Sequence, residues 1–465
     1  MFPSVAFIPG PRAEQSPRTV TGRRNSLTVS GSSRGRHRRV AAVSRDVTDL
    51  RPNHRFMLWP LMRTSWADVV PTSADAGPAA IVIPTARPLD GDVPGVDLAL
   101  ALSRSLGCHV LLICSGAARV EDFPWSRADG LTDRVHVLDY TRIPDEWRCR
   151  NAVLDVHGSG YDVAEKRNLA LALATYLGWG QIMFLDDDMQ ASDASDGLNA
   201  RSVAWSSLVM RQEGLAACGW NCEDFPDNSV VCHARRLAGL EQGTFIGGGA
   251  LLVRVDRETP FFPDMYNEDW FFLIDVAMQA PARLAAIGLA GSISQVDYNP
   301  YSWQRVEREE MGDVLAECLM NLIEDRGAAG LGFADTGFWR KALRSRRRLI
   351  GRVAVLLRAL TIARLGLGCG RRREAVRALR QARTVSRRLE PESLVAWVEA
   401  WREHRDAWRS HLDGLARAGA AVGPDAVAVL RALSAGAVGC DAPAGVVMPV
   451  GSGNHELTTA LVGTS

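Results

Sequence analysis

Short apolar runs alternate with amphipathic segments in the first half of the chain, starting just after Pro78. The runs have the length and the Val, Ile and Leu content of buried strands, and the segments between them have helical spacing. We expect strands at 79–83, 109–114, 134–138 and 181–185, and helices at 96–106 and 162–177. This alternation predicts an α/β fold with a mostly parallel sheet and helices on both faces.

The pattern becomes less regular after Ser192 and then almost entirely helical beyond Gly337. In the irregular part we expect a helix at 202–212, turn-rich polar sequence to 244, a short apolar strand at 250–253 and a helix at 267–279. The chain is therefore divided into a disordered basic leader (1–75), an α/β catalytic domain (76–335), an Arg-rich helical region (336–440) and a flexible tail (441–465).

Charge is segregated along the 465 residues, although the formal net charge is only +1. Residues 1–55 carry a net charge of +8 and residues 336–388 a net charge of +16, which leaves −23 for the rest. An acidic core between basic extensions suits divalent cations better than nucleic acid. No nucleic-acid partner is therefore expected.

The nine cysteines are scattered without a disulfide framework, and no apolar run reaches the 18 or so residues of a membrane span. We expect cytosolic thiols, no secretory signal and a cytoplasmic protein, with peripheral contact with the inner face of the membrane as an option. Cys218, Cys222, Cys232 and His233 match no compact zinc pattern, so buried or loop thiols are the preferred interpretation.

An acidic triplet, Asp186–Asp188, ends the apolar run 181–185. A buried strand delivers its last side chains to the carboxyl edge of the sheet, where open α/β folds bind ligands. Because side chains alternate along an extended chain, Asp186 and Asp188 should point the same way and Asp187 the other. Two carboxylates about 4 Å apart repel by roughly 1 kcal/mol in water and about 4 kcal/mol at an effective dielectric of 20. Mg²⁺ or Mn²⁺ would relieve this repulsion and bridge to a diphosphate, whereas a solvated turn is the alternative.

The helix expected at 162–177 opens with an acidic capping pair, Asp162 and Glu165, followed by Lys166 and Arg167. A helix N-terminus followed by cations can hold a phosphate group. The alternative for both cations is an exposed helix face.

Two further segments carry candidate chemistry downstream. Glu268 and Asp269 suit the first turn of a helix that Asn267 would cap, which is a purely structural alternative to a catalytic role. The run Gly247-Gly248-Gly249 has no Cβ atoms and permits positive φ, so a substrate can approach the main chain; a tight turn before a strand explains it as well.

These motifs together resemble family 2-type glycosyltransferases with the GT-A fold. The resemblance lies in Lys166-Arg167-Asn168, in Phe184-Leu185 followed by the triplet as a DxD motif, and in the opening 83–87, within a span of about 79–310. It implies that Asp186 and Asp188 bind Mn²⁺ or Mg²⁺. Asp297 is a weak third ligand, because the His that many such enzymes place there is absent.

The resemblance also implies roles for the remaining residues. Asp269 would be the general base if the reaction inverts the sugar, with Glu268 as second choice. The acceptor would lie against Gly247, Gly248, Gly249 and Trp270. The donor would contact Pro84, Thr85, Arg87, Lys166, Arg167, Asn168, Asp186 and Asp187.

The expected function is metal-dependent transfer of a sugar from a nucleotide-diphosphate donor, such as a UDP- or GDP-sugar, to an unidentified hydroxyl acceptor. One alternative is a sugar-phosphate nucleotidyltransferase, although the Gly-rich phosphate loop usual for that class is not found after Ile83. The other is a catalytically degenerate GT-A protein that binds a sugar or a partner. The missing His leaves this second alternative open.

Residues 338–388 combine Leu, Val and Ile with Arg at helical intervals. Packing as surface helices on the acidic flank of the catalytic domain is the plain interpretation. Docking on anionic lipid is the alternative and would suit a lipid-linked acceptor. No nucleic-acid reader motif accompanies the charge.

Overall fold

The computed structural model describes residues 54–60, 77–144, 147, 162–192, 196–222, 229–240, 245–279, 287–296, 300–363 and 369–435. All of them belong to one compact unit. Most of the expected leader and all of the expected tail from 441 on lie outside the described residues. Among the described helices, none combines the length and the hydropathy that a bilayer span requires.

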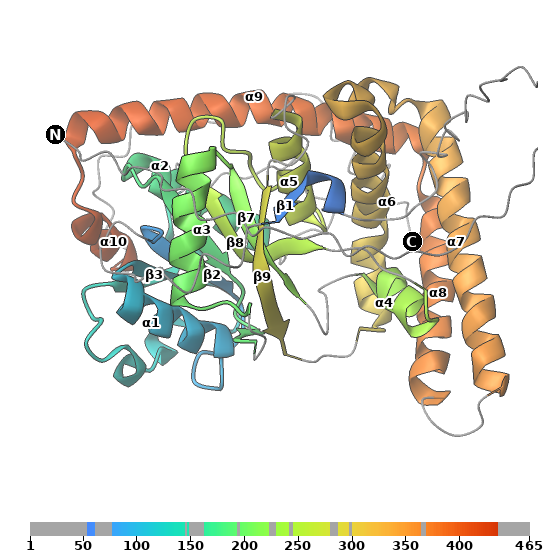
Figure 1. Ribbon diagram of the computed structural model, residues 1–465, viewed down its shortest axis with the longest axis horizontal. Helices are drawn as coiled ribbons and strands as arrows, with labels where there is room; N and C mark the ends of the chain where they lie inside the picture. Colours follow the sequence, from blue (N-terminus) through green and yellow to red (C-terminus); the bar gives the residue numbers. More distant parts are fainter. Residues whose placement is uncertain are drawn as a thin grey trace, which may run out of the picture. The chain divides into compact units, whose positions relative to one another are not determined.

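A nine-stranded mixed sheet forms the centre of the molecule (Figure 1). Its strand order is β4-β3-β2-β5-β8-β7-β9-β1, and the two-residue β6 pairs with β9. β8 is antiparallel to both of its neighbours, and the other pairs along this order are parallel. The strands are β1 (Leu58–Pro60), β2 (Ala80–Thr85), β3 (His109–Cys114), β4 (Val135–Asp139), β5 (Gln181–Leu185), β6 (Met189–Gln190), β7 (Ala217–Cys222), β8 (Ile246–Arg254) and β9 (Ile287–Gln295).

Ten α-helices are described around and beyond the sheet. They are α1 (Pro94–Leu106), α2 (Val163–Tyr176), α3 (Ala200–Glu213), α4 (Val230–Leu237), α5 (Glu268–Gln279), α6 (Trp303–Arg326), α7 (Thr336–Ala363), α8 (Cys369–Arg388), α9 (Pro391–Val422) and α10 (Ala426–Ser434). Short 3-10 helices include η1 (His54–Met57), η3 (Val120–Asp122), η4 (Trp125–Ala128), η5 (Tyr140–Arg142) and η7 (Gly327–Phe333).

Alternation of side chains along the strands builds one core on each face of the sheet. In β2, Ile81 and Ile83 enter the core beneath α1 and α3, whereas Ala80 and Val82 enter the core beneath α2 and α5. The predicted fold class is thus confirmed: a mostly parallel sheet with helices on both faces, followed by a helical region.

The second of these cores continues without interruption into the helical region. Trp397 and Trp401 of α9 pack against Phe271 of α5, with ring centroids 4.7 and 5.7 Å away. α9 also crosses α2 so closely that a Cβ on Gly419 would lie 1.9 Å from the carbonyl oxygen of Tyr176. The boundary that we placed at 335/336 is therefore not a break in the packing.

The segment expected to be turn-rich and polar up to Thr244 contains β7 and α4, so that expectation was wrong there. β9 and α6 were also not predicted. In β7 the sequence is Ala-Cys-Gly-Trp-Asn-Cys, without a β-branched residue, and its pairing with β8 and β9 supplies the stability that local propensity lacks.

Candidate active site

A polar cavity of about 220 Å³ opens where β2 and β5 end at the carboxyl edge of the sheet. Its wall combines the first loop, the acidic triplet, the start of α2 and the segment that leads into α5. The lining residues are Arg87, Val163, Arg167, Asp186, Asp187, Asp188, Tyr266, Asn267, Glu268 and Asp269. Seven of these ten were named from the sequence as site residues.

The acidic triplet does not continue the strand alternation. β5 ends at Leu185, and the chain turns so that the Met189 amide donates to the Asp186 carbonyl at 3.2 Å. Asp187 and Asp188 consequently share one partner, because both lie within ion-pair distance of Arg87, at 3.4 and 2.8 Å. The prediction that Asp186 and Asp188 point one way and Asp187 the other was wrong for this reason.

The first loop holds the triplet from the β2 side. Thr85 donates its hydroxyl hydrogen to Asp187 Oδ2 at 2.7 Å, and burial raises the pKa of Asp187 to about 6. Pro84, by contrast, is buried within β2 and does not line the cavity. The half-exposed Arg87 thus places its guanidinium against Asp187 and Asp188, whereas the sequence had led us to expect a divalent ion between Asp186 and Asp188.

Lys166, Arg167 and Asn168 are all buried, so the exposed-face alternative is excluded. The Lys166 ammonium donates to the Thr85 carbonyl oxygen at 2.8 Å and to the Ser115 hydroxyl at 2.7 Å, and it pairs with Asp162 at 2.9 Å. Lys166 therefore fixes the first loop and does not line the cavity. Asp162 occupies the N-cap position without a side-chain capping bond, so the expected capping pair is not formed.

Asn168 also makes its side-chain hydrogen bonds outside the cavity. Its amide group exchanges two 2.8 Å hydrogen bonds with the backbone of Phe262. These bonds tie α2 to the chain segment that leads towards α5. Asn168 therefore has a structural role, and it is not among the residues that line the cavity.

Arg167 connects the two acidic groups of the site. Its guanidinium donates to Asp186 Oδ1 at 2.8 Å and to Glu268 Oε1 at 2.5 Å. The triplet after β5 and the acidic pair of α5 thus face each other across one cavity, on either side of a buried cation.

The acidic pair is strongly desolvated. Burial raises the pKa of Glu268 to about 8, although the charge of Arg167 acts in the opposite direction, and burial also raises the pKa of Asp269. Asp269 accepts hydrogen bonds from the backbone amides of Gly248 at 2.7 Å and Trp270 at 2.8 Å. A carboxylate held in this way, with a raised pKa, is suited to accept a proton.

The glycine run lies within β8 and not in a turn before a strand, and none of its members has positive φ. A Cβ on Gly247 would lie 2.6 Å from Asp269 Oδ2, and one on Gly248 would lie 2.4 Å from the guanidinium carbon of Arg167. A Cβ on Gly249 would lie 2.2 Å from the Met189 side chain. The absence of Cβ atoms in this run therefore leaves room for the side chains of Asp269, Arg167 and Met189.

A second, apolar pocket of about 40 Å³ adjoins the polar cavity and shares Asp269 with it. Gly247, Gly249 and Trp270, all predicted to contact the acceptor, contribute to its wall, whereas Gly248 does not. The other lining residues are Met189, Trp220, Cys222, Phe245, Ile246, Ala250 and Ile293. Asp269 thus stands between a charged compartment and an aromatic one.

No group of three His, Cys, Asp or Glu side chains in the described part of the chain is arranged to hold a metal ion, which also counts against the zinc alternative. Asp297 lies outside the described residues. The carboxylates of Asp186 and Asp188 are each paired with an arginine at 2.8 Å, Asp186 with Arg167 and Asp188 with Arg87. In proteins generally, Mg²⁺ is often held by one or two such carboxylates together with substrate phosphates.

Sequence reasoning missed Tyr266 and Val163, which line the cavity, and Gln295, whose amide lies 3.3 Å from Asp188 Oδ2. Gln295 ends β9, a strand that the sequence did not reveal. No local signal marks these three residues, since only the packing of α2, α5 and β9 brings them to the site.

Comparisons with known proteins gave structural likeness only. No protein-family model and no curated protein matches the chain. Glucosyl-3-phosphoglycerate synthase from Mycobacterium tuberculosis, solved with Mn²⁺, UDP and phosphoglyceric acid, has a TM-score of 0.35 and 17% identity over 56% of this chain and 85% of that chain. The mannosyltransferase PcManGT from Pyrobaculum calidifontis, solved with GDP-Man and Mn²⁺, has a TM-score of 0.34 and 14% identity over 74% of this chain and 92% of that chain.

Proposed function

We propose that the chain is a glycosyltransferase that moves a sugar from a nucleotide-diphosphate donor to a hydroxyl acceptor. The observation that supports this proposal is the arrangement around Arg167: three carboxylates at the end of β5 face the acidic pair of α5 across one cavity. Such a site places a diphosphate-binding edge opposite a proton acceptor, which sugar transfer to a hydroxyl requires.

The donor diphosphate binds at the edge formed by the first loop and the triplet. Asp186 and Asp188 hold Mn²⁺ or Mg²⁺, which would offset the negative charge that develops on the leaving nucleotide diphosphate. Arg87 is half-exposed, and its guanidinium is paired with Asp187 and Asp188. This guanidinium can turn from Asp188 to a phosphate oxygen. Because the described protein groups form no complete metal cage, the ion and the donor bind together.

The acceptor enters from the apolar pocket next to Trp270. Asp269 removes the proton from the attacking hydroxyl in an inverting reaction, while its two backbone hydrogen bonds fix the direction of the carboxylate. Glu268 stays paired with Arg167 and is the second candidate for the base.

A test measures donor binding by calorimetry with UDP- and GDP-sugars, with and without Mn²⁺. We expect binding that strengthens with Mn²⁺ and loses this metal-dependent part in Asp188→Asn. The matched control is Asp139→Asn, because Asp139 ends β4 on the same sheet edge but does not line the cavity. Absence of nucleotide binding in both conditions contradicts the proposal and leaves the degenerate binding protein. Release of pyrophosphate from UTP or GTP in the presence of a sugar 1-phosphate, with no nucleoside diphosphate released from the nucleotide-sugars, identifies the nucleotidyltransferase alternative.

We also propose that α7 and α8 contact an anionic membrane. Arg344, Arg348 and Arg352 are exposed at one-turn spacing on α7, and Val355 follows on the same face with 62% of its surface exposed. Basic side chains around an exposed apolar patch suit an anionic lipid surface. A cytoplasmic location at the inner face of the membrane fits this contact.

A further inference from the structure

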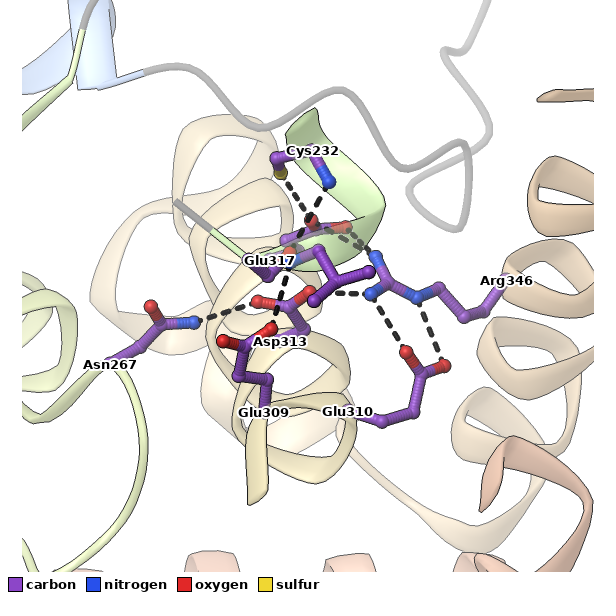
Figure 2. A network of polar contacts seen from close by, with 9 residues as sticks. Cys232, Asn267, Glu309, Glu310, Asp313, Glu317 and Arg346 are labelled. Atoms are coloured by element: carbon purple, nitrogen blue, oxygen red, sulfur yellow. Dashed lines mark hydrogen bonds and ion pairs between the residues drawn. The ribbon is translucent and has the colours of Figure 1, made fainter. Parts of the chain in front are cut away.

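A buried ionic cluster connects α7 through α6 to Asn267, the residue before the acidic pair (Figure 2). At its centre is Arg346 of α7, whose side chain is fully buried. Its guanidinium contacts three carboxylates of α6: Glu310 at 3.0 Å, Asp313 at 2.5 Å and Glu317 at 3.1 Å. The spacing of these acids puts them on one face of α6, directed towards α7.

Asp313 has a second partner, on the side of the site. Its Oδ1 accepts a 3.1 Å hydrogen bond from the amide nitrogen of Asn267, whereas its Oδ2 accepts from Arg346. Asn267 lines the polar cavity and directly precedes Glu268 and Asp269. One carboxylate therefore joins α7 to the first residue before the acidic pair.

Asn267 has an unusual backbone conformation. Its φ of 68° makes it the only non-glycine residue with positive φ in the described part of the chain. A left-handed conformation costs roughly 1–2 kcal/mol for a residue with a Cβ, and it persists only where the surroundings hold it. The side-chain bond to Asp313 is a contact that can hold it.

The backbone of α6 supports the same segment. A Cβ on Gly312 would lie 2.1 Å from the carbonyl oxygen of Tyr266, so only glycine allows this approach. Tyr266 and Asn267 are thus both in contact with α6, the helix that carries Asp313. From Asn267 the path continues through Glu268 and Arg167 to Asp186.

We infer that Arg346 and Asp313 are positioning residues for the acidic pair: they hold Asn267 in its left-handed conformation, and through it they fix Glu268 and Asp269 opposite the triplet. The helical region is accordingly part of the active centre, although none of its described residues lines the cavity. The inference rests on the proposed function for its kinetic readout, whereas its structural readout is independent of activity.

The decisive variant is Asp313→Ala, because Arg346 keeps Glu310 and Glu317 as partners and the cluster stays charge-paired. We expect kcat to fall about 10- to 100-fold, as a misplacement near 1 Å can cause, with donor affinity little changed. Hydrogen exchange followed by mass spectrometry should show faster exchange of the amides of Gly248 and Phe271, which bond to Asp269 and Asn267.

A double variant separates positioning from general stability. Asn267→Gly removes the hydrogen bond to Asp313 without straining the left-handed backbone, so it should also lower kcat. Because both single variants remove the same bond, Asp313→Ala combined with Asn267→Gly should lose no more kcat than Asp313→Ala alone. A double variant in which the two losses multiply contradicts the inference. So does exchange in Asp313→Ala that is unchanged at Gly248 and Phe271.

The matched control is Asp275→Asn. Asp275 lies in the same helix as the acidic pair and forms a buried ion pair with Arg405 of α9 at 2.5 Å, but it does not line the cavity. This variant should lower the unfolding midpoint and leave kcat of the folded protein unchanged. If the wild-type chain turns over no donor, the proposed function fails, and the exchange measurements still decide whether Asp313 holds the segment.

Discussion

At the scale of single residues, the site depends on the absence of a Cβ atom at Gly248. Gly248 leaves the space that the guanidinium of Arg167 occupies. Arg167 cannot move away, because it is buried and bonded to Asp186 on one side and to Glu268 on the other. The conformational freedom usually associated with glycine is not used here, since Gly248 lacks positive φ.

Gly248→Ala should therefore displace Arg167 and separate the two acidic groups. We expect a loss of about 1–3 kcal/mol in the free energy of unfolding, typical of overpacking, together with a loss of donor binding. Urea unfolding and calorimetry measure the two effects. Gly180→Ala is the control, because a Cβ there meets nothing within 4 Å and Gly180 lacks positive φ. Equal behaviour of the two variants would contradict the role given to the missing Cβ.

At the scale of elements, the first turn of α5 carries the acidic pair for which we propose the catalytic role. Glu268 and Asp269 stand at a helix N-terminus, where the helix dipole favours negative charge. Burial outweighs that effect and raises the pKa of both groups. The side chain of Asn267, which we expected to cap α5, donates a hydrogen bond to Asp313 of α6.

The raised pKa of Glu268 predicts a pH-dependent stability. Its value is about 8 in the folded chain and near its ordinary value of 4.5 in the unfolded chain, so the folded state binds this proton more tightly. The contribution of Glu268 is fully present below the unfolded pKa and is lost as the pH rises towards 8. The free energy of unfolding of the wild type should therefore fall relative to that of Glu268→Gln over this range. Urea titrations across the range measure the difference, and a constant difference would argue against the shift.

Element by element, the sequence predicted the α/β half of the chain well. β3 and β5 have the predicted bounds, and α1, α2, α3 and α5 lie within a few residues of their predicted bounds. These elements have strong local periodicity. β7 and β9 contain glycine, serine or asparagine, and their neighbouring strands stabilise them. α6 buries a row of acidic residues that the sequence pattern alone would assign to an exposed face. Their signals depend on partners that are distant in the sequence.

At the scale of the whole molecule, the basic region has two faces with different tasks. Arg346 points inward and is fully buried among acids, whereas Arg344, Arg348 and Arg352 of the same helix are exposed. Packing on an acidic partner, the plain interpretation of the sequence, thus describes the inner face. The outer face carries the proposed membrane contact.

Replacing Arg344, Arg348 and Arg352 by Gln should weaken sedimentation with vesicles that contain phosphatidylglycerol. Each basic residue near such a surface contributes about 1 kcal/mol, so the partition coefficient should fall about 100-fold. Replacing the exposed Arg201, Arg402 and Arg417 removes the same charge elsewhere and should have little effect. Equal losses in the two variants would show attraction by net charge only, and binding to neutral phosphatidylcholine vesicles would likewise contradict the proposal.

The sequence by itself determined the alternation that builds the parallel sheet and the carboxylates that end β5 and begin α5, because these depend on residue type and local spacing. Only the tertiary structure decided which partner each group has. Asp188 meets Arg87, Asn168 meets the Phe262 backbone, and Asn267 meets Asp313. Packing determines where side chains point beyond a strand end and which distant helices meet. Local periodicity of the sequence carries no information about such packing.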